Sequence, residues 1–304
     1  MKLPTAQNKG LCSIEISSGG IAVAYTPNPA NPEITVCAFQ PYQNTEQSGN
    51  NNQLKENLEK IVSQYNLKKT LCNWVLHPDY YRITLINIPN VPQSEYKKAV
   101  RWQIKDIVDY PLEDVAVDIF YPDELEKVLK KIYVVVAKAS FLQNIVNTIQ
   151  DCDLYPMAVD VREFAIRNLI SNLATQNETV GLLNIVDESC LMVLVKQNNI
   201  RFVRRIPVGL KNIKNNDYNE LIAELQRSFN YCQTELKQEA PVKLFMAPKI
   251  DIDLNKNMAQ NIGKSLNKEI SILDLQKIMS FKTTITQQIE SSCWIAAGGA
   301  LRKA

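Results

Sequence analysis

The fold of this chain is decided by residues 180–209, VGLLNIVDESCLMVLVKQNNIRFVRRIPVG. Apolar runs alternate in it with short polar turns, and the runs cover residues 180–185, 190–195 and 200–206. Such a pattern predicts three consecutive strands joined as a meander. The first turn carries Asp187, Glu188 and Ser189. Turn backbone N–H groups bind phosphate and carboxylates hold Mg²⁺, so this turn raises the question of a nucleotide site.

The same order of elements occurs twice in the chain. Near the N-terminus we expect three strands, a helix and a strand, at residues 11–17, 21–26, 34–39, 54–65 and 71–76. After the meander that begins at residue 180, we expect a long helix and a strand, at residues 216–236 and 242–246. Two β-β-β-α-β units in one chain are typical of the duplicated fold of actin, sugar kinases and heat-shock chaperones. In that fold a nucleotide lies between two lobes.

We therefore predict a duplicated actin-like (ribonuclease H-like) α/β fold, with two lobes and an inserted small α+β subdomain. The insertion is expected to open with a helix that has Ser94 as its N-cap and ends at Pro111. The predicted parts are a first lobe (β-β-β-α-β), the inserted subdomain, a return to the first lobe and a second lobe (β-β-β-α-β-α), at residues 1–91, 92–150, 151–179 and 180–304.

The composition is that of an ordinary globular protein. The 304 residues are 45% hydrophobic and 22% charged, and the formal net charge is +2. Lys and Arg are spread along the chain, whereas nucleic-acid binding requires a basic face. The sequence thus predicts no nucleic-acid partner.

The seven cysteines and the single histidine argue against disulfides and zinc. The cysteines form no C-x-x-C pair and most lie in apolar runs, which predicts buried free thiols in a reducing compartment. A zinc site is not expected, because His77 is the only histidine. We see no signal peptide and no apolar stretch of about 18 to 20 residues, so a cytoplasmic chain without a membrane span is expected.

The stretch 98–120, KAVRWQIKDIVDYPLEDVAVDIF, is the most specific in the chain. It resembles the PilM-like proteins of type IV pilus assembly, and is most similar to the MshI proteins of mannose-sensitive haemagglutinin (MSHA) pilus biogenesis. Four further stretches agree with this family in order and spacing: AVDVREFAIRNL (158–169), RFVRRIPVG (201–209), ELQRSFNYCQ (224–233) and GGALR (298–302). The resemblance covers nearly all of the chain.

The resemblance implies a cytoplasmic protein peripheral to the inner membrane. Members of the family bind the short cytoplasmic tail of an inner-membrane pilus assembly protein, in a groove between the first lobe and the inserted subdomain. They also contact the pilus assembly ATPase complex. We expect the same partners here, and a scaffold or adaptor function rather than catalysis.

The motifs that hold nucleotide in this superfamily are altered. Glu15 stands where ATP-binding relatives carry Asp, and Asn184-x-Val186 replaces Asp-x-Gly at the second turn. The third site, expected as Ser-Gly-Gly-Gly, reads Phe-Met-Ala-Pro-Lys at residues 245–249. Val186 adds a branched side chain where phosphate approaches, and Pro248 removes a backbone donor. We therefore predict a degenerate site with no catalytic residues and no metal.

If ATP and Mg²⁺ are nevertheless bound, residues of the two turns and of the last helix would hold them. These are Ser17, Ser18, Gly19, Gly20, Asp187, Glu188, Ser189, Gly298 and Gly299. The turn at 17–20 is also explained as a tight hairpin without a ligand, which is the interpretation we favour. A nucleotide-gated actin-like ATPase therefore remains as the rival function. The cytoplasmic lobe of a type II secretion platform protein is a second rival with the same architecture.

Some other residues have two interpretations each. Asp160 either lines the cleft or, as we favour, is the N-cap of the following helix. Arg201, Arg204 and Arg205 either bind an acidic group or, as we favour, form a solvated strand end. Trp102 lies off the apolar stripe of its helix, and the sequence leaves open whether it packs in the subdomain or anchors a partner. The partner-binding residues cannot be predicted from the sequence.

Overall fold

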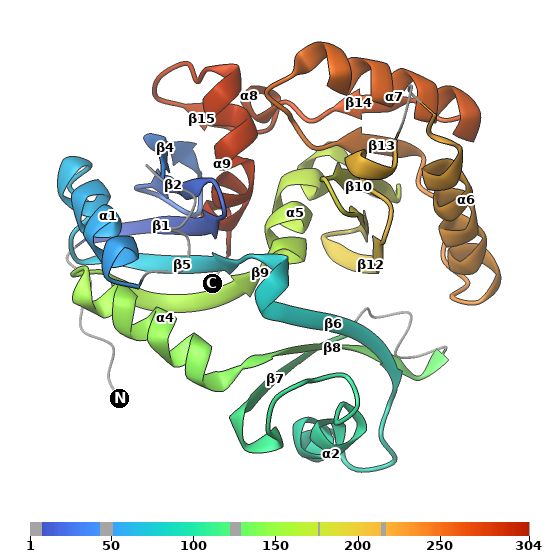
Figure 1. Ribbon diagram of the computed structural model, residues 1–304, viewed down its shortest axis with the longest axis horizontal. Coiled ribbons are helices and arrows are strands. Elements are labelled where there is room, and N and C mark those ends of the chain that lie inside the picture. Colours follow the sequence, from blue (N-terminus) through green and yellow to red (C-terminus); the bar gives the residue numbers. More distant parts are fainter. Residues whose placement is uncertain (1–7, 43–50, 122–128, 176, 214–216, 304) are drawn as a thin grey trace.

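Five strands form the sheet of the first lobe, in the order β4-β2-β1-β5-β9. The computed structural model describes residues 8–42, 51–121, 129–175, 177–213 and 217–303 (Figure 1). The strands are Val36–Pro41 (β4), Gly20–Thr26 (β2), Asn8–Ser17 (β1), Thr70–Leu76 (β5) and Tyr155–Val161 (β9). β1, β2 and β4 form the antiparallel meander, and β5 and β9 continue it in parallel.

The second lobe repeats this sheet, in the order β12-β11-β10-β13-β14. Its strands are Asn199–Ile206 (β12), Cys190–Lys196 (β11), Val180–Ile185 (β10), Lys243–Met246 (β13) and Ile270–Ile272 (β14). Every residue of β10 is buried, because helices cover both faces of the sheet. The meander expected at residues 180–206 is present.

Helices cover the outer face of each sheet. In the first lobe these are Asn51–Gln64 (α1) and Ala139–Asp151 (α4), and in the second lobe Asn219–Thr234 (α6) and Ile252–Leu266 (α7). Alternate strand residues separate the two faces: Val23 packs with α1 and α4, whereas Ala22 and Ala24 pack toward the centre of the molecule.

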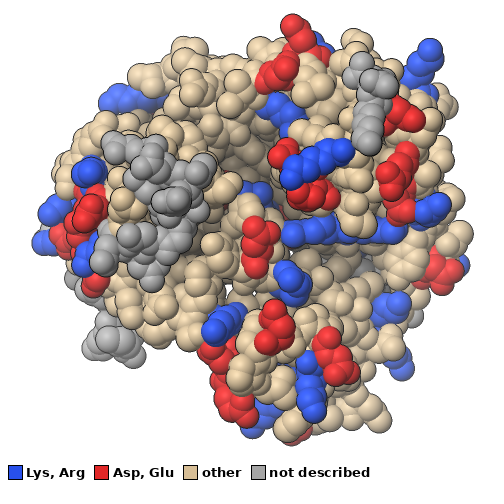
Figure 2. Space-filling view, viewed as in Figure 1, with Lys and Arg blue, Asp and Glu red and all other residues tan. Residues whose placement is uncertain are grey.

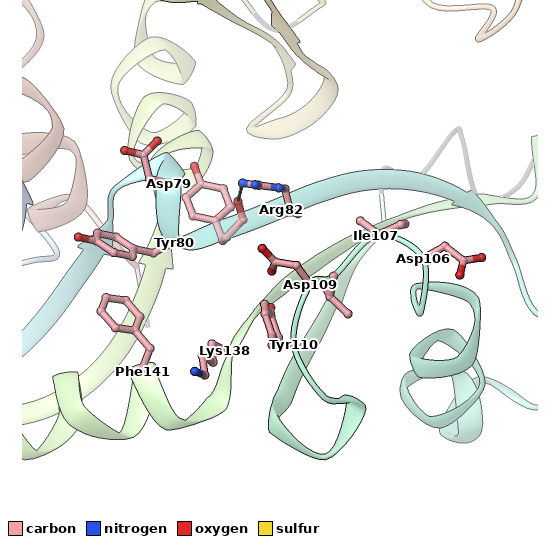
Figure 3. Close-up of a pocket in the computed structure, with 11 residues that line it drawn as sticks. Asp79, Tyr80, Arg82, Asp106, Ile107, Asp109, Tyr110, Lys138 and Phe141 are labelled. Carbon is pink, nitrogen blue, oxygen red and sulfur yellow. Dashed lines mark hydrogen bonds between the residues drawn. The ribbon is translucent and has the colours of Figure 1, made fainter.

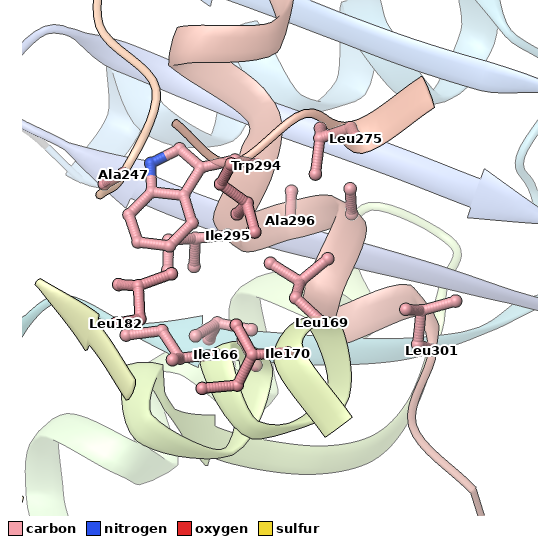
Figure 4. Packing of buried hydrophobic residues seen from close by; sticks show 14 of the residues in the cluster. Ile166, Leu169, Ile170, Leu182, Ala247, Leu275, Trp294, Ile295, Ala296 and Leu301 are labelled. Atoms are coloured by element: carbon pink, nitrogen blue, oxygen red, sulfur yellow. The ribbon is translucent and has the colours of Figure 1, made fainter. Parts of the chain in front are cut away.

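Two helices lie between the sheets, Arg162–Ile170 (α5) and Gln287–Ala300 (α9) (Figure 1). Their apolar side chains build one core that reaches both lobes, with Ile166 and Leu169 from α5, Trp294 and Ile295 from α9, and Leu182 from β10 (Figure 4). Two short strands, Glu33–Ile34 (β3) and Ser280–Phe281 (β15), pair beside this core, next to the short helix Leu275–Ile278 (α8). The lobes are thus joined by shared apolar packing.

A separate three-stranded sheet, in the order β6-β8-β7, forms the small subdomain at the bottom of Figure 1. Its elements are Tyr81–Asn87 (β6), Val115–Phe120 (β7), Lys131–Lys138 (β8) and the helix Tyr96–Gln103 (α2). The predicted boundaries of the subdomain, residues 92 and 150, stay a prediction. Two elements pack on the other side of these boundaries from the one predicted. β6 pairs with β8, and α4 packs Ile145 and Ile149 into the core of the first lobe.

The helix that we expected to run from Ser94 to Pro111 is shorter. Ser94 lies in a 3₁₀ turn and makes no capping hydrogen bond, and α2 ends at Gln103. Apolar residues continue at helical spacing past this end, because Val108 and Tyr110 still pack against the core of the small sheet. They lie in a non-helical segment, so the spacing of apolar residues did not distinguish a helix from a turn here.

The other face of the small sheet packs against the second lobe. The Tyr133 hydroxyl accepts a hydrogen bond from the Val203 N–H at 3.1 Å, and the rings of Phe120 and Tyr133 are stacked with centroids 4.9 Å apart. Phe120 also meets the Phe164 ring of α5 edge-on. The subdomain therefore touches both lobes.

All seven cysteines are free, and six of them are buried. Within the described ranges, no helix is long and apolar enough to cross a membrane, and no group of three His, Cys, Asp or Glu side chains is placed to bind a metal ion. Acidic and basic side chains are interspersed over the face shown in Figure 2.

Candidate functional site

The first turn, between β1 and β2, is bonded to its own chain. The Gly19 N–H donates to the Ser17 hydroxyl at 3.3 Å, and the Tyr42 N–H donates to the Gly19 carbonyl at 3.1 Å. Gly20 has φ +153°, and a Cβ there would lie 2.2 Å from the Gln40 carbonyl oxygen. This glycine is thus required by the close approach of β4. Ser18 and Gly19 are exposed at the tip.

Glu15, which lies in β1 two residues before Ser17, forms a buried ion pair with Arg162. The Arg162 Nε donates to the Glu15 carboxylate at 2.5 Å, and a second guanidinium nitrogen contacts the same oxygen. Burial raises the pKa of Glu15, and the charge of Arg162 opposes this rise. The carboxylate that replaces the family Asp is therefore already neutralised by a side chain of α5.

The second turn, between β10 and β11, is hydrogen-bonded to the segment after β12. The Leu210 N–H donates to the Val186 carbonyl at 2.9 Å, and the Lys211 N–H to the Asp187 carbonyl at 3.0 Å. The Lys211 ammonium also pairs with the Glu188 carboxylate. A Cβ on Gly209 would lie within 2.5 Å of the turn backbone. The backbone of this turn is thus bonded to a strap of the same chain at residues 209–211, while the side chains of Asp187 and Glu188 stay exposed.

A lysine from the third motif reaches the second turn. The Lys249 Nζ donates to the Ile185 carbonyl at 2.5 Å, and its own carbonyl accepts from Gln287 of α9 at 2.8 Å. Burial lowers the pKa of Lys249, while the nearby carboxylate of Asp187 opposes this. A lysine side chain from the motif expected to contact nucleotide therefore bonds the backbone at the end of β10.

Gly298 and Gly299 contact the first lobe by close packing. A Cβ on Gly298 would lie 2.4 Å from the Ala165 carbonyl oxygen, and one on Gly299 would lie 2.2 Å from the Ser13 Oγ. The Asn168 and Asn73 side-chain amides donate to the carbonyls of Gly298 and Gly299, at 3.0 and 3.1 Å. Close contact of α9 with α5 and β1 explains both glycines.

Asp160 is not the N-cap of α5, and this interpretation was wrong. The helix starts after Val161 without a capping side chain. The Asp160 carboxylate instead accepts from Asn73 at 3.4 Å and pairs with Arg302, a contact across 142 residues of sequence. Asp160 thus ties the C-terminal segment to the first lobe.

The three arginines of β12 do not form one patch. Arg201 is buried, so the interpretation as a solvated strand end was wrong for it. Arg204 pairs with Glu224 of α6 at 2.9 Å, and Arg205 is exposed. Arg205 lines a cavity together with Glu163 and Leu191.

A groove of about 430 Å³ lies where the first lobe meets the small subdomain (Figure 3). Three segments line it: the 3₁₀ turn and start of β6, the segment after α2, and the junction of β8 and α4. Their residues are Asp79, Tyr80, Tyr81, Arg82, Asp106, Ile107, Val108, Asp109, Tyr110, Lys138 and Phe141. The groove therefore exists because α2 ends early and the chain at 106–110 runs along it.

The groove offers both apolar and acidic surface. Tyr80 and Phe141 stack with centroids 4.4 Å apart, and Tyr80 is 45% exposed (Figure 3). Ile107 is also exposed, on the opposite side of the groove. Burial and the carboxylate of Asp109 raise the pKa of Tyr110, so this phenol keeps its proton. Three carboxylates outnumber the two cations of the groove, Arg82 and Lys138, so the exposed Tyr80 ring and its surroundings are suited to a peptide with apolar and basic side chains.

A second cavity, of about 380 Å³, shares Asp79, Tyr81 and Arg82 with the groove and extends to Leu191 and Arg205 of the second lobe. The wall between the two is rigid at one point, because the Tyr81 hydroxyl donates to the buried Glu163 carboxylate at 2.6 Å. Burial raises the pKa of Glu163, and the bond from Tyr81 opposes this. One wall of the groove is thus held by α5, which packs on both lobes.

Sequence reasoning did not find the groove residues. Asp79 and Tyr80 belong to no motif and meet residues 106–110 only through the pairing of β6 with β8. The only signal was local, in the specific stretch 98–120, which contains residues 106–110.

Comparisons with known proteins support the fold. No protein-family model and no curated protein matches the sequence. A chain of the PilM–PilN type IV pilus biogenesis complex is 19% identical with a TM-score of 0.72, and the match covers 96% of this chain and 97% of that one. A Bacteroides thetaiotaomicron protein with an actin-like ATPase fold and unknown function is 12% identical with a TM-score of 0.54, covering 96% and 99%.

The cytoplasmic domain of EpsL, an inner-membrane component of the type II secretion system of Vibrio cholerae, is 10% identical with a TM-score of 0.52, covering 97% and 96%. At such low sequence identities, the structural likeness shows the fold and nothing further. The predicted actin-like α/β class is confirmed.

Proposed function

We propose that the protein is a non-enzymatic cytoplasmic scaffold of a type IV, MSHA-like pilus assembly complex. In this proposal it lies at the inner membrane and binds there the cytoplasmic tail of a pilus assembly protein. It would thereby connect this protein to the pilus assembly ATPase complex. The observation that carries the proposal is the groove between the first lobe and the subdomain, where the exposed Tyr80 ring, stacked on Phe141, shares the surface with three carboxylates.

Three lines of reasoning support this assignment. The solved structure with a TM-score of 0.72 is a complex of PilM with a second protein, PilN, and the EpsL domain belongs to an inner-membrane component. The MSHA assignment depends on the sequence resemblance at residues 98–120. The nucleotide motifs favour a scaffold, because the two turns and the lysine of the third motif are bonded to the chain itself.

The groove favours an extended tail as the ligand. Three separate segments line it, and Asp106, Ile107 and Asp109 are exposed along it. An apolar side chain of the tail would pack beside the Tyr80–Phe141 ring pair, and a basic one would pair with Asp106 or Asp109. Such binding uses side-chain pockets along an extended strand and requires no chemistry.

Photo-crosslinking in membranes tests the assignment. A photo-reactive residue at Ile107 is expected to capture the tail of an inner-membrane protein, and the same residue at Tyr231 on α6 is expected not to. Tyr80→Ala should then weaken binding of a synthetic peptide of that tail by about tenfold or more, because a central aromatic contact is lost. Tyr231→Ala is the matched control, since Tyr231 is 37% exposed and lies on the second lobe. Equal weakening by both variants would contradict a groove site.

The nucleotide-gated ATPase remains the alternative, and thermal unfolding with millimolar ATP and Mg²⁺ separates the two. We expect no measurable shift of Tm. A micromolar site would stabilise the fold by about 4 kcal/mol at a thousandfold excess of ligand, which corresponds to a shift of several degrees. Such a shift, with slow phosphate release, would establish the ATPase. In the second alternative the chain is the cytoplasmic lobe of a type II secretion platform protein, and the identity of the protein captured by crosslinking separates it from the proposal.

A further inference from the structure

The outer face of α2 carries the most exposed large apolar side chain in the described part of the chain. Trp102 is 74% exposed, whereas Val100 and Ile104 on the other side of the helix are buried in the core of the small sheet. The side chain therefore contributes nothing to the core of its own subdomain. Its exposure rules out the interpretation that the indole packs in the subdomain, and leaves the ring accessible to a partner.

Basic side chains surround this tryptophan. The segment 96–105, YKKAVRWQIK, contains four cations and no carboxylate. Lys97 pairs with Asp118 at 2.7 Å, and Arg101 donates to the Val115 carbonyl at 3.0 Å. Lys98 and Lys105 are exposed and have no salt bridge with any residue that the structure describes. Two ammonium groups without a salt bridge thus flank the indole, Lys98 within α2 and Lys105 in the turn that follows it.

The face of α2 is continuous with the groove. Asp106 and Ile107 line the groove and follow Lys105 directly in the chain. A tail that emerges from a membrane and enters the groove would bring this face close to the bilayer. This step rests on the proposed function, whereas the charge and exposure of the face do not.

We propose that Lys98, Trp102 and Lys105 contact an anionic lipid surface. Indole rings prefer the boundary between headgroups and acyl chains, and lysines beside them attract anionic headgroups while their stems cover apolar surface. Charge complementarity selects this occupant over a neutral bilayer. The contact would orient the subdomain so that the groove opens toward the membrane.

Intrinsic fluorescence reports on this contact with the unmodified protein. Trp74 and Trp294 are only 4% and 6% exposed, so a change of the emission maximum on adding vesicles reports on Trp102. Vesicles of phosphatidylglycerol with phosphatidylethanolamine should shift the emission to the blue at low ionic strength. Salt should reverse the shift, because it screens charges beyond about 10 Å at 0.1 M. Trp102→Phe should abolish the shift.

Vesicle flotation with charge variants decides the proposal. Each cation near an anionic surface contributes about fivefold to affinity, so Lys98→Glu with Lys105→Glu should weaken binding about 25-fold or more. Lys256→Glu with Lys264→Glu, two exposed positions on α7, changes the net charge equally and should leave binding unchanged.

Absence of a shift at low salt, equal binding to phosphatidylcholine vesicles, or equal loss in both double variants would overturn the proposal. The proposal would also be overturned if an acidic protein shifted the Trp102 emission to the blue and vesicles did not. Tyr80→Ala should leave vesicle binding intact, so failure here is distinct from failure of the groove.

Discussion

Replacing Arg162 by alanine is expected to lower the free energy of unfolding by about 3–5 kcal/mol at pH 7. Glu15 is buried, and Arg162 is the cation that bonds its carboxylate. Without the guanidinium, a charged carboxylate would remain in the interior without a counter-charge. Chemical denaturation monitored by circular dichroism measures the loss, as a change of midpoint at constant m-value.

The pH dependence of this variant identifies the cause. The folded-state pKa of Glu15 already lies above its ordinary value, and removal of Arg162 should raise it further. The folded state then binds the proton more tightly than the unfolded state, so stability falls as pH rises above about 4.5. The deficit relative to the parent protein should therefore shrink as the pH is lowered toward that value.

Two controls accompany Arg162→Ala. Arg162→Met with Glu15→Leu removes both charges and should recover most of the loss, because apolar pairs of similar volume often replace buried ion pairs without cost. Arg227→Ala breaks an exposed pair with Glu224 and should change stability by about 0.5 kcal/mol or less. A loss below about 1 kcal/mol for Arg162→Ala would mean that the first turn opens onto water and could admit a ligand.

The repeated sheet was predictable because it depends on local pattern. The apolar runs of β10 and β11 are buried on both faces, and such strands retain their signal in the sequence without knowledge of their neighbours. The end of α2 was not predictable. Val108 and Tyr110 keep the helical spacing but meet the core from a turn, which only the position of the small sheet determines.

The polar contacts of the candidate site are non-local, so the sequence alone could not predict them. Glu15 and Arg162 are 147 residues apart, and Lys249 reaches a carbonyl 64 residues away. The altered motifs showed that phosphate would be poorly held, but the side chains that take up the turn contacts belong to other elements. The groove likewise joins Tyr80 to Phe141 across the whole inserted subdomain.

The single histidine offers a direct measurement beside both cavities. His77 follows β5, and its Nδ1 lies 3.1 Å from the Asp79 carboxylate, which lines the groove and the second cavity. Burial lowers the pKa of His77 to about 4, helped by Arg162 and Arg205 and opposed by Asp79. The imidazole is therefore neutral at pH 7. Its contact with Asp79 is a hydrogen bond from Nδ1–H rather than an ion pair.

Lowering the pH from 6.5 to 4 is expected to remove about 3 kcal/mol of stability through His77 alone. In this window the unfolded chain binds a proton at the imidazole and the folded chain does not, so the free energy of unfolding decreases as the pH is lowered. Buried Glu15 and Glu163, whose pKa values are raised, contribute with the opposite sign, and only the difference from His77→Asn isolates the histidine. An NMR titration of the one imidazole should give a pKa near 4. A value near 6.5, with identical pH profiles for the parent protein and His77→Asn, would show that the region between β5 and β6 is open to water. The wall that the groove shares with the second cavity would then be too mobile to hold a tail in one position.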